Sequence, residues 1–236
     1  MTYFGASGVG VVAPIVWTHD IAGSSNHVTD EGSVDAGRFS VWLDTINPVL
    51  RKGETSDVPC GSCTACCTSS QFVHIAPDEV DALAVIPGDL LFPAPRLPAG
   101  HLLMGYDEHG HCPMLIDGAC SIYEHRPRTC RTYDCRVFAA SGLELEDQAK
   151  SDINDRVRRW HFQLVDRTDR AKRDAVRSAA VLLAEFEPRF DATERTLAAI
   201  EIHDLFLAVD SDDYGSTAAT PNPESVRVAL RSRRGS

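Results

Sequence analysis

Cysteine is absent from most of this 236-residue chain, because all eight cysteines lie between residues 60 and 135. Lysine is absent from that same window, which carries nine acidic residues against four arginines, within a chain of net charge -11. Thiolates would add more negative charge, so a metal cation has an electrostatic reason to bind there and a nucleic-acid phosphate has none. We therefore expect a metal in this window and no nucleic acid as a partner.

Long apolar runs and a basic N-terminus are also missing. The apolar stretch 9–17 is broken by Pro14, and neither Lys nor Arg precedes Arg38, so the charged start of a signal peptide is absent. No apolar run approaches the roughly 18 residues that a membrane span requires. We expect a cytoplasmic protein without a membrane partner, in which thiols stay reduced. Adjacent Cys66 and Cys67 also argue against a disulfide framework, since neighbouring cysteines rarely pair with each other.

The glycine-rich motifs of nucleotide-binding proteins and the GxSxG elbow of serine hydrolases do not occur. An apolar content of 43% is enough for a core. The expected fold class is α+β, a small irregular cysteine-rich metal-binding domain with short β-hairpins, followed by about three α-helices. The expected parts are an N-terminal arm over 1–34, a cysteine-cluster domain with a leading helix over 35–142, a helical region over 143–209 and a disordered tail over 210–236.

Apolar residues at helical spacing mark the region after the cysteines. A leading helix within 34–50 is expected to stop at Pro48, and Asp191 with Glu194 resembles a capping box. The three later helices are predicted from the following apolar positions: Ile153, Val157, Trp160 and Leu164; Ala171, Ala175, Ala179, Leu182 and Phe186; Leu197, Ile200, Leu205 and Phe206.

A β-meander is predicted over 102–123, after a Pro-rich connecting loop over 87–100. Asp117-Gly118 between apolar residues is typical of a type I' hairpin, which would pair Leu115 with Cys120. Strand alternation would then place Cys112 and Cys120 on opposite faces. Either the two thiols belong to different positions of the site, or a β-bulge turns one of them to the other face of the hairpin.

Four of the cysteines form the run CGSCTACC, in which the residues between the cysteines are small. Two intervening residues are about the minimum that lets successive sulfurs curl onto one centre, and the donors suit an iron-sulfur cluster or tetrahedral zinc. Consecutive side chains diverge, so Cys67 cannot easily join Cys66 on one ion. Cys67 either faces a second metal or is a structural thiol.

The run CGSCTACC, together with HGHCPMLIDGACSIYEHRPRTCRTYDC over 109–135, resembles the YkgJ-like CxxCxxCC family, described as a zinc- or iron-chelating domain. The resemblance covers about residues 59–137 and implies metal binding. Relatives that methylate flagellin lysines carry an iron-sulfur cluster, which favours a [4Fe-4S] cluster over a zinc or iron ion. The ligands that the resemblance implies are Cys60, Cys63, Cys66, Cys67, Cys112, Cys120, Cys130 and Cys135.

Histidines and arginines near the cysteines have plainer roles in this interpretation. His74 stands where the family more usually has an aliphatic residue, and a partly buried strand histidine is favoured over a ligand. Arg126 and Arg131 are expected to donate to backbone carbonyls around the hairpin, with an anionic substrate as the alternative. Arg156, Arg158 and Arg159 are expected to form a solvated helix face.

Three functions compete. The first is an iron-sulfur or metal-chelating protein whose centre is structural or redox-active. The second is a cluster-dependent enzyme that acts on a protein or small molecule, as the methylase relatives suggest. The third is a zinc-stabilised module that uses the helices to dock a protein partner. Neither the substrate nor the partner can be read from the residues.

Overall fold

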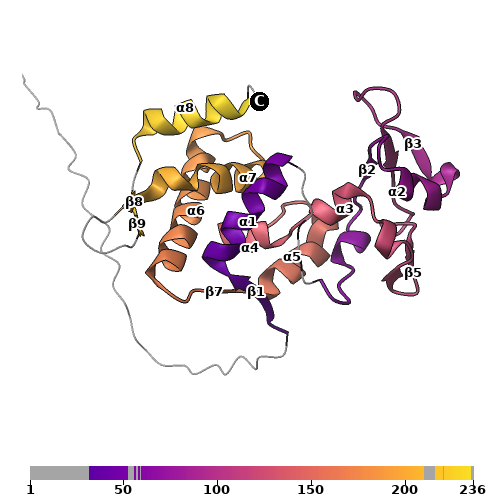
Figure 1. Ribbon diagram of the computed structural model, residues 1–236, viewed down its shortest axis with the longest axis horizontal. Helices are drawn as coiled ribbons and strands as arrows, with labels where there is room; N and C mark the ends of the chain where they lie inside the picture. Colours follow the sequence, from indigo (N-terminus) through magenta and orange to yellow (C-terminus); the bar gives the residue numbers. More distant parts are fainter. Residues whose placement is uncertain are drawn as a thin grey trace, which may run out of the picture. The chain divides into compact units, whose positions relative to one another are not determined.

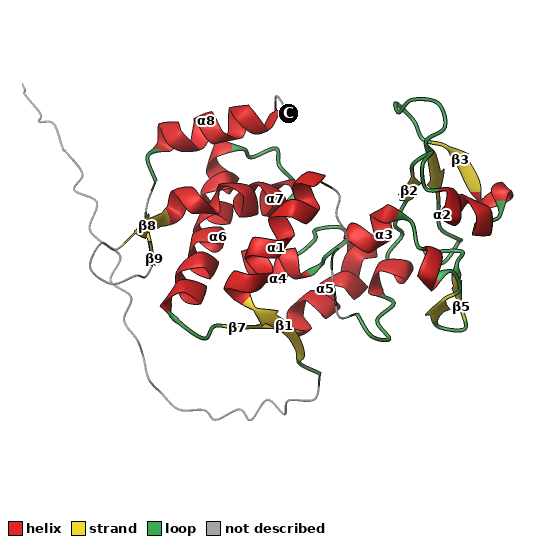
Figure 2. Ribbon diagram, viewed as in Figure 1, coloured by secondary structure: helices red, strands yellow, loops and turns green. Residues whose placement is uncertain are grey.

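Helices carry most of the described chain, and short strands connect or support them (Figures 1 and 2). The computed structural model describes residues 32–52, 56, 58, 60–209, 216–219 and 221–234. The described residues from 32 onward form one unit by their contacts. The predicted N-terminal arm over 1–34 lies outside the described residues except for residues 32–34. The mixture of helices and small sheets confirms the α+β class. No helix of the described segments is both long and apolar enough to cross a bilayer.

The helices, in chain order, are α1 (Phe39–Lys52), α2 (Val80–Val85), α3 (Arg128–Thr132), α4 (Arg136–Ser141), α5 (Ser151–Arg159), α6 (Arg167–Phe186), α7 (Ala192–Ile202) and α8 (Pro223–Arg234). The strands are β1 (Val34–Arg38), β2 (Val73–Ile75), β3 (Leu91–Pro93), β4 (Leu102–Met104), β5 (Leu115–Ile116), β6 (Ala119–Cys120), β7 (Trp160–Gln163), β8 (Leu207–Val209) and β9 (Ser216–Ala218). Single turns of 3₁₀ helix lie between them, of which η1 (Ala65–Thr68) carries two of the cysteines.

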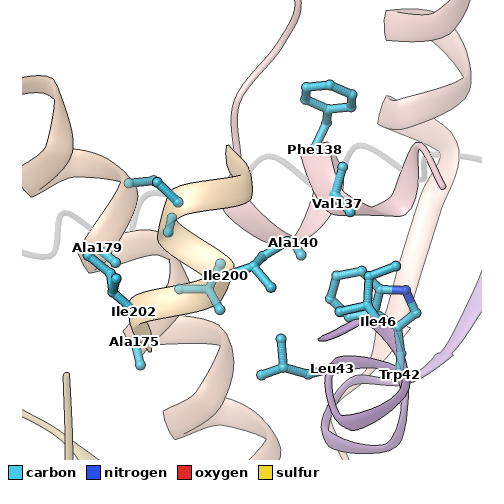
Figure 3. Packing of buried hydrophobic residues seen from close by; sticks show 14 of the residues in the cluster. Trp42, Leu43, Ile46, Val137, Phe138, Ala140, Ala175, Ala179, Ile200 and Ile202 are labelled. Carbon is cyan, nitrogen blue, oxygen red and sulfur yellow. The ribbon is translucent and has the colours of Figure 1, made fainter. Parts of the chain in front are cut away.

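The larger core lies among α1, α4, α6 and α7 (Figure 3). Helix α6 contributes Ala175 and Ala179 at helical spacing, and their small side chains let α1, α4 and α7 approach it closely. Helix α7 begins with the predicted capping box, in which Asp191 accepts from the backbone N–H of Glu194 at 2.8 Å. Of the helices in this core, α1, α6 and α7 were predicted from the sequence, and α4 was not.

The end of the chain differs from the expected disordered tail over 210–236. Helix α8 buries Val226 and Leu230 in the same core as α6 and α7. The spacing of these two residues is one turn of helix, and a short amphipathic segment of this kind is held by tertiary packing more than by its own propensity. The sequence offered only a short apolar set, Val226, Val228, Ala229 and Leu230, among basic and polar residues.

Two further differences concern α1 and α5. Helix α1 continues past Pro48 to Lys52, because Val49 is buried in the core and packing holds the turn after the proline. The predicted helix containing Trp160 ends at Arg159, and Trp160 begins strand β7. β7 pairs in parallel with β1, a partner more than one hundred residues away that periodicity cannot reveal.

A second, smaller core lies under a three-stranded sheet of order β2-β4-β3. Its buried residues are Val73, Ile75, Ala82, Ile86, Met104 and Met114. The meander expectation is wrong for β4, which pairs with β2 and β3 instead of with the hairpin β5-β6. Part of the Pro-rich loop forms the edge strand β3, where the missing N–H of Pro93 is tolerated.

A buried carboxylate joins the two halves of the larger core. Asp169 in α6 is inaccessible to solvent and accepts hydrogen bonds from the Arg38 guanidinium at 3.0 Å and from the Ser40 N–H at 3.0 Å. It also accepts from the N–H of Val165, at 3.0 Å. Burial alone would raise the pKa of Asp169, but the bonds from Ser40 and its other donors outweigh burial, and the pKa lies below its ordinary value.

We expect Asp169→Ala to lower the free energy of unfolding by about 3 kcal/mol, because it leaves several buried donors without an acceptor. Asp44→Ala is the matched control, since Asp44 pairs with Lys172 but is largely exposed, and its loss should cost under about 1 kcal/mol. A depressed pKa contributes stability at neutral pH that is lost as the pH falls through the carboxyl's range. The loss begins only below the ordinary carboxyl pKa, so urea unfolding at pH 7 and at pH 2 measures both effects, and equal losses in the two variants would contradict this account.

Candidate metal centre

All eight cysteines line one cavity of about 410 Å³. Its remaining walls are mostly apolar or small residues, with Tyr123, Tyr133, Arg126 and Arg156 among the polar ones. Among the described residues that line this cavity, none is a histidine, an aspartate or a glutamate. The donor set is therefore all sulfur, from residues that are up to 75 positions apart in the sequence (135 minus 60).

The run from Cys60 to Cys67 curls because its backbone turns twice. Gly61 has φ +57°, and the Cys63 N–H donates to the Cys60 carbonyl at 3.0 Å. The Cys67 N–H then donates to Thr64 at 2.7 Å and starts η1. Because Gly61 adopts a left-handed conformation that side chains disfavour, the small residues of this run are a conformational requirement.

The end of η1 is attached to α5. The Lys150 ammonium donates to the carbonyls of Ser69 at 2.5 Å and Ser70 at 3.1 Å, and a lysine at this position satisfies the unpaired carbonyls of a helix end. The Thr68 hydroxyl reaches the carboxylate of Asp152 in the first turn of α5. The cysteine run is thus fixed against a helix that the sequence interpretation placed in a separate region.

The hairpin forms as predicted, with Leu115 opposite Cys120 and positive φ at both Asp117 and Gly118. Cys112 nevertheless lies on the same cavity as Cys120. The Leu115 N–H donates to the Cys112 carbonyl at 2.9 Å, so Cys112 lies in a turn where strand alternation does not apply. The expectation of opposite faces is therefore wrong, because β5 is only two residues long.

Helix α3 presents Cys130 to the cavity. The buried carboxylate of Glu79 accepts from the Ala76 N–H at 2.8 Å and also from the N–H of Arg128, which joins the start of α2 to the start of α3. The Thr129 hydroxyl donates to the His74 carbonyl at 2.8 Å. These bonds fix α3 against β2 of the smaller core.

Cys135 is buried in the larger core at the start of α4. Its sulfur accepts a hydrogen bond from the Trp160 indole N–H at 3.1 Å. The preceding Asp134 is buried and accepts from the Trp42 indole at 3.0 Å and from the Arg136 guanidinium at 2.7 Å. This network fixes the backbone on which Cys135 stands.

The thiols are costly to ionise without a cation. Burial raises the pKa of Cys66 well above its ordinary value, and the neighbouring Cys135 thiolate raises it further. Burial and then the Cys112 thiolate raise the pKa of Cys67 to about 11. Burial, and then the charges of Cys112 and Cys67, raise the pKa of Cys130 to about 12, although Cys130 remains accessible to solvent. The cavity favours a positively charged occupant that removes this cost.

Hydrogen-bond donors that the sequence interpretation missed surround the sulfurs. Tyr133 lines the cavity, and its buried hydroxyl has no hydrogen-bond partner among the described residues. Burial and the Cys66 thiolate raise the pKa of Tyr133, so its hydroxyl is a donor. Sulfur atoms inside the cavity are the acceptors that this orphan hydroxyl fits. In the sequence, the signal that placed Tyr133 near the cysteines was its position two residues before Cys135.

Arg156 corrects the expectation of a solvated arginine face on α5. It is buried, stacks 4.3 Å from the centre of the Trp160 ring and donates to the Cys60 carbonyl at 3.5 Å. Arg158 behaves as predicted, since it is exposed and pairs with Glu144 and with Asp155. Periodicity located the helix but could not tell which of its arginines faces the cavity.

The other candidates take the plainer roles. His74 is a half-buried strand residue whose Nε2 lies 2.9 Å from Nδ1 of His101, away from the cavity lining. Arg126 donates to the Tyr123 carbonyl at 2.8 Å, as predicted, while it also lines the cavity. Arg131 is not explained by that prediction, because its buried Nε has no partner among the described residues.

The sulfurs surround a space instead of converging on a point. Within the described residues, no three side chains of His, Cys, Asp or Glu are arranged closely enough to hold one metal ion. A mononuclear zinc site gathers four ligands at about 2.3 Å from one atom. A cubane cluster distributes four thiolates over four irons, so its ligating sulfurs stand apart. The all-sulfur lining and the orphan Tyr133 hydroxyl fit a soft metal ion or an iron-sulfur cluster.

Metal uptake at pH 7 should release about four protons per four-thiolate centre, because the raised pKa values keep the free thiols protonated. The affinity should therefore fall as the pH is lowered. Zinc titration by calorimetry in two buffers of different ionisation enthalpy counts the protons. Release of fewer than about two protons would mean that the thiolates are already ionised, which contradicts the raised pKa values.

Comparison with known families gives one match. Residues 59–155 match the model of the CxxCxxCC family, described as a "putative zinc- or iron-chelating domain". The match reaches beyond the cysteines into α5, which agrees with the packing of η1 on that helix. A search of the curated proteins and of the solved structures found no match to this chain. Residues 59–155, less than half of the chain, are thus similar to the CxxCxxCC family, which is described as chelating zinc or iron.

Proposed function

We propose that this chain is an iron-sulfur protein whose cysteines hold a [4Fe-4S] cluster with a structural or redox role. The observation that carries the proposal is the eight thiols that line one cavity, with no histidine, aspartate or glutamate among the described lining residues. Thiolates are the usual protein ligands of iron-sulfur clusters. The family description, zinc or iron chelation, agrees with a soft-metal centre of either kind.

The donors around the sulfurs support a redox role. The Trp160 indole N–H donates to the Cys135 sulfur, and the Tyr133 hydroxyl lies in the cavity wall without a partner. Hydrogen bonds to ligating sulfur stabilise the more negative, reduced state of a cluster and raise its reduction potential. The buried Arg156 acts in the same direction, because its positive charge stands beside the Cys60 backbone.

A second candidate is a cluster-dependent enzyme that acts on a protein or small molecule. Exposed aromatic side chains favour it: Phe72 lines the cavity, is 55% exposed, and lies 5.1 Å from Tyr106 and 6.2 Å from Phe92 between ring centres. A grouped exposed aromatic surface is typical of a binding site. The same surface would serve a zinc-stabilised module that docks a protein partner.

The acidic charge supports a partner other than nucleic acid, and the eight free thiols support the cytoplasm as the location. Both remain parts of the proposal. Neither a membrane nor a nucleic acid is needed to account for the cavity.

Protein purified without oxygen should contain iron and acid-labile sulfide in equal amounts, with the broad visible absorption of thiolate-to-iron charge transfer. Cys60→Ser, Cys63→Ser and Cys66→Ser should each lose at least half of the bound iron. His74→Ala is the matched control, because His74 lies outside the cavity lining, and its iron content should match that of the unmodified protein. Zinc at full occupancy without iron, even after anaerobic reconstitution with iron and sulfide, would refute the cluster.

A further inference from the structure

The adjacent pair Cys66 and Cys67 divides the cavity. Both lie in η1, a 3₁₀ helix with three residues per turn, so their side chains leave the backbone about 120° apart. Ala65 of the same turn packs on the larger core, whereas the Cys67 carbonyl accepts the Cys112 N–H at 2.7 Å. Cys112 itself packs on the smaller core. The two neighbouring side chains therefore diverge, and the backbone of Cys67 is bonded to a residue of the smaller core.

One group of thiols belongs to the side of the larger core. Cys135 is buried in that core and accepts from Trp160. Arg156 stacks on Trp160 and donates to the Cys60 carbonyl, so Cys60 and Cys135 are attached to the same pair of side chains. Cys63 is tied to Cys60 by its N–H at 3.0 Å. Cys66 lines the same cavity as these three residues, and its side chain leaves η1 in a different direction from that of Cys67.

The other group belongs to the side of the smaller core. Cys112 is bonded through its N–H to Cys67, and its carbonyl accepts from Leu115, the strand partner of Cys120. Cys130 stands on α3, which Thr129 attaches to β2 of the smaller core. Cys130 lines the same cavity as Cys67, Cys112 and Cys120. Every member of this group is thus linked to the hairpin or to the sheet.

We propose that the chain holds two separate four-thiolate metal centres, the first bound by Cys60, Cys63, Cys66 and Cys135 and the second by Cys67, Cys112, Cys120 and Cys130. This inference rests on the proposed function and specifies its ligands. Four thiolates are the complete ligand set of a [4Fe-4S] cluster or of a structural zinc ion. Two-cluster ferredoxins likewise use one short cysteine run to supply ligands to both of their clusters. Here the peptide bond between Cys66 and Cys67 links the two centres.

The test uses serine variants of the full chain, purified and reconstituted anaerobically with iron, sulfide and zinc. Cys66→Ser and Cys67→Ser are a matched pair of neighbours, and each should keep half of the metal content of the unmodified protein. The combination of Cys66→Ser with Cys135→Ser should keep the same half, because both residues serve one centre. The combination of Cys66→Ser with Cys130→Ser should retain no metal.

Elemental and sulfide analysis counts the centres, and native mass spectrometry of the unmodified protein counts them without any variant that fails to fold. The two groups of ligands are supported by two clusters, by one cluster with one zinc ion, or by two zinc ions per chain. Two zinc ions would refute the iron-sulfur function but not the two groups of ligands. One centre per chain overturns the two groups even if that centre is a cluster. Equal losses in the two double variants would also overturn them.

Discussion

Eight thiols around one cavity are the constraint on which the rest of this structure depends. Burial raises the pKa of six of them and neighbouring thiolates raise it further, so ionising these thiols at neutral pH is costly without a cation. A metal ion or cluster supplies that cation and replaces the missing hydration. The smaller core contains few large side chains, so metal binding is expected to stabilise the fold around it.

Buried polar groups position the segments that carry the sulfurs. Asp134 holds the segment before Cys135, and Glu79 holds the start of α3 before Cys130. Each carboxylate accepts several hydrogen bonds, which offsets the cost of burying its charge. Helix α5 completes the arrangement, since Lys150 caps η1 and Arg156 reaches the cavity. The cavity thus lies where the larger and the smaller core meet.

Features set by local hydrogen bonds could be predicted from the sequence. The hairpin at Asp117-Gly118, the capping box at Asp191 and the helical spacing in α6 were each confirmed. Features set by distant partners could not be predicted. The pairing of β1 with β7 and the burial of Arg156 depend on segments that the chain brings together only when folded.

The cysteine set shows the same division. Sequence identified all eight thiols as one group, but strand alternation misplaced Cys112 because the strand is too short for alternation to hold. The two-residue spacing in the first run predicts a turn, and the structure adds that Cys135 packs in the larger core and Cys112 on the smaller one. Tyr133 and Trp160 carry no metal-binding signature and become relevant only through their contacts.

The central claim is that sulfur alone surrounds the bound metal. X-ray absorption at the iron edge of the anaerobically purified protein, with the zinc edge as a second measurement, tests this most directly. The account predicts a first shell made only of sulfur at about 2.3 Å, with iron-iron scattering beyond it. A first shell that contains nitrogen or oxygen from protein ligands would contradict it, because no described histidine or carboxylate lines the cavity.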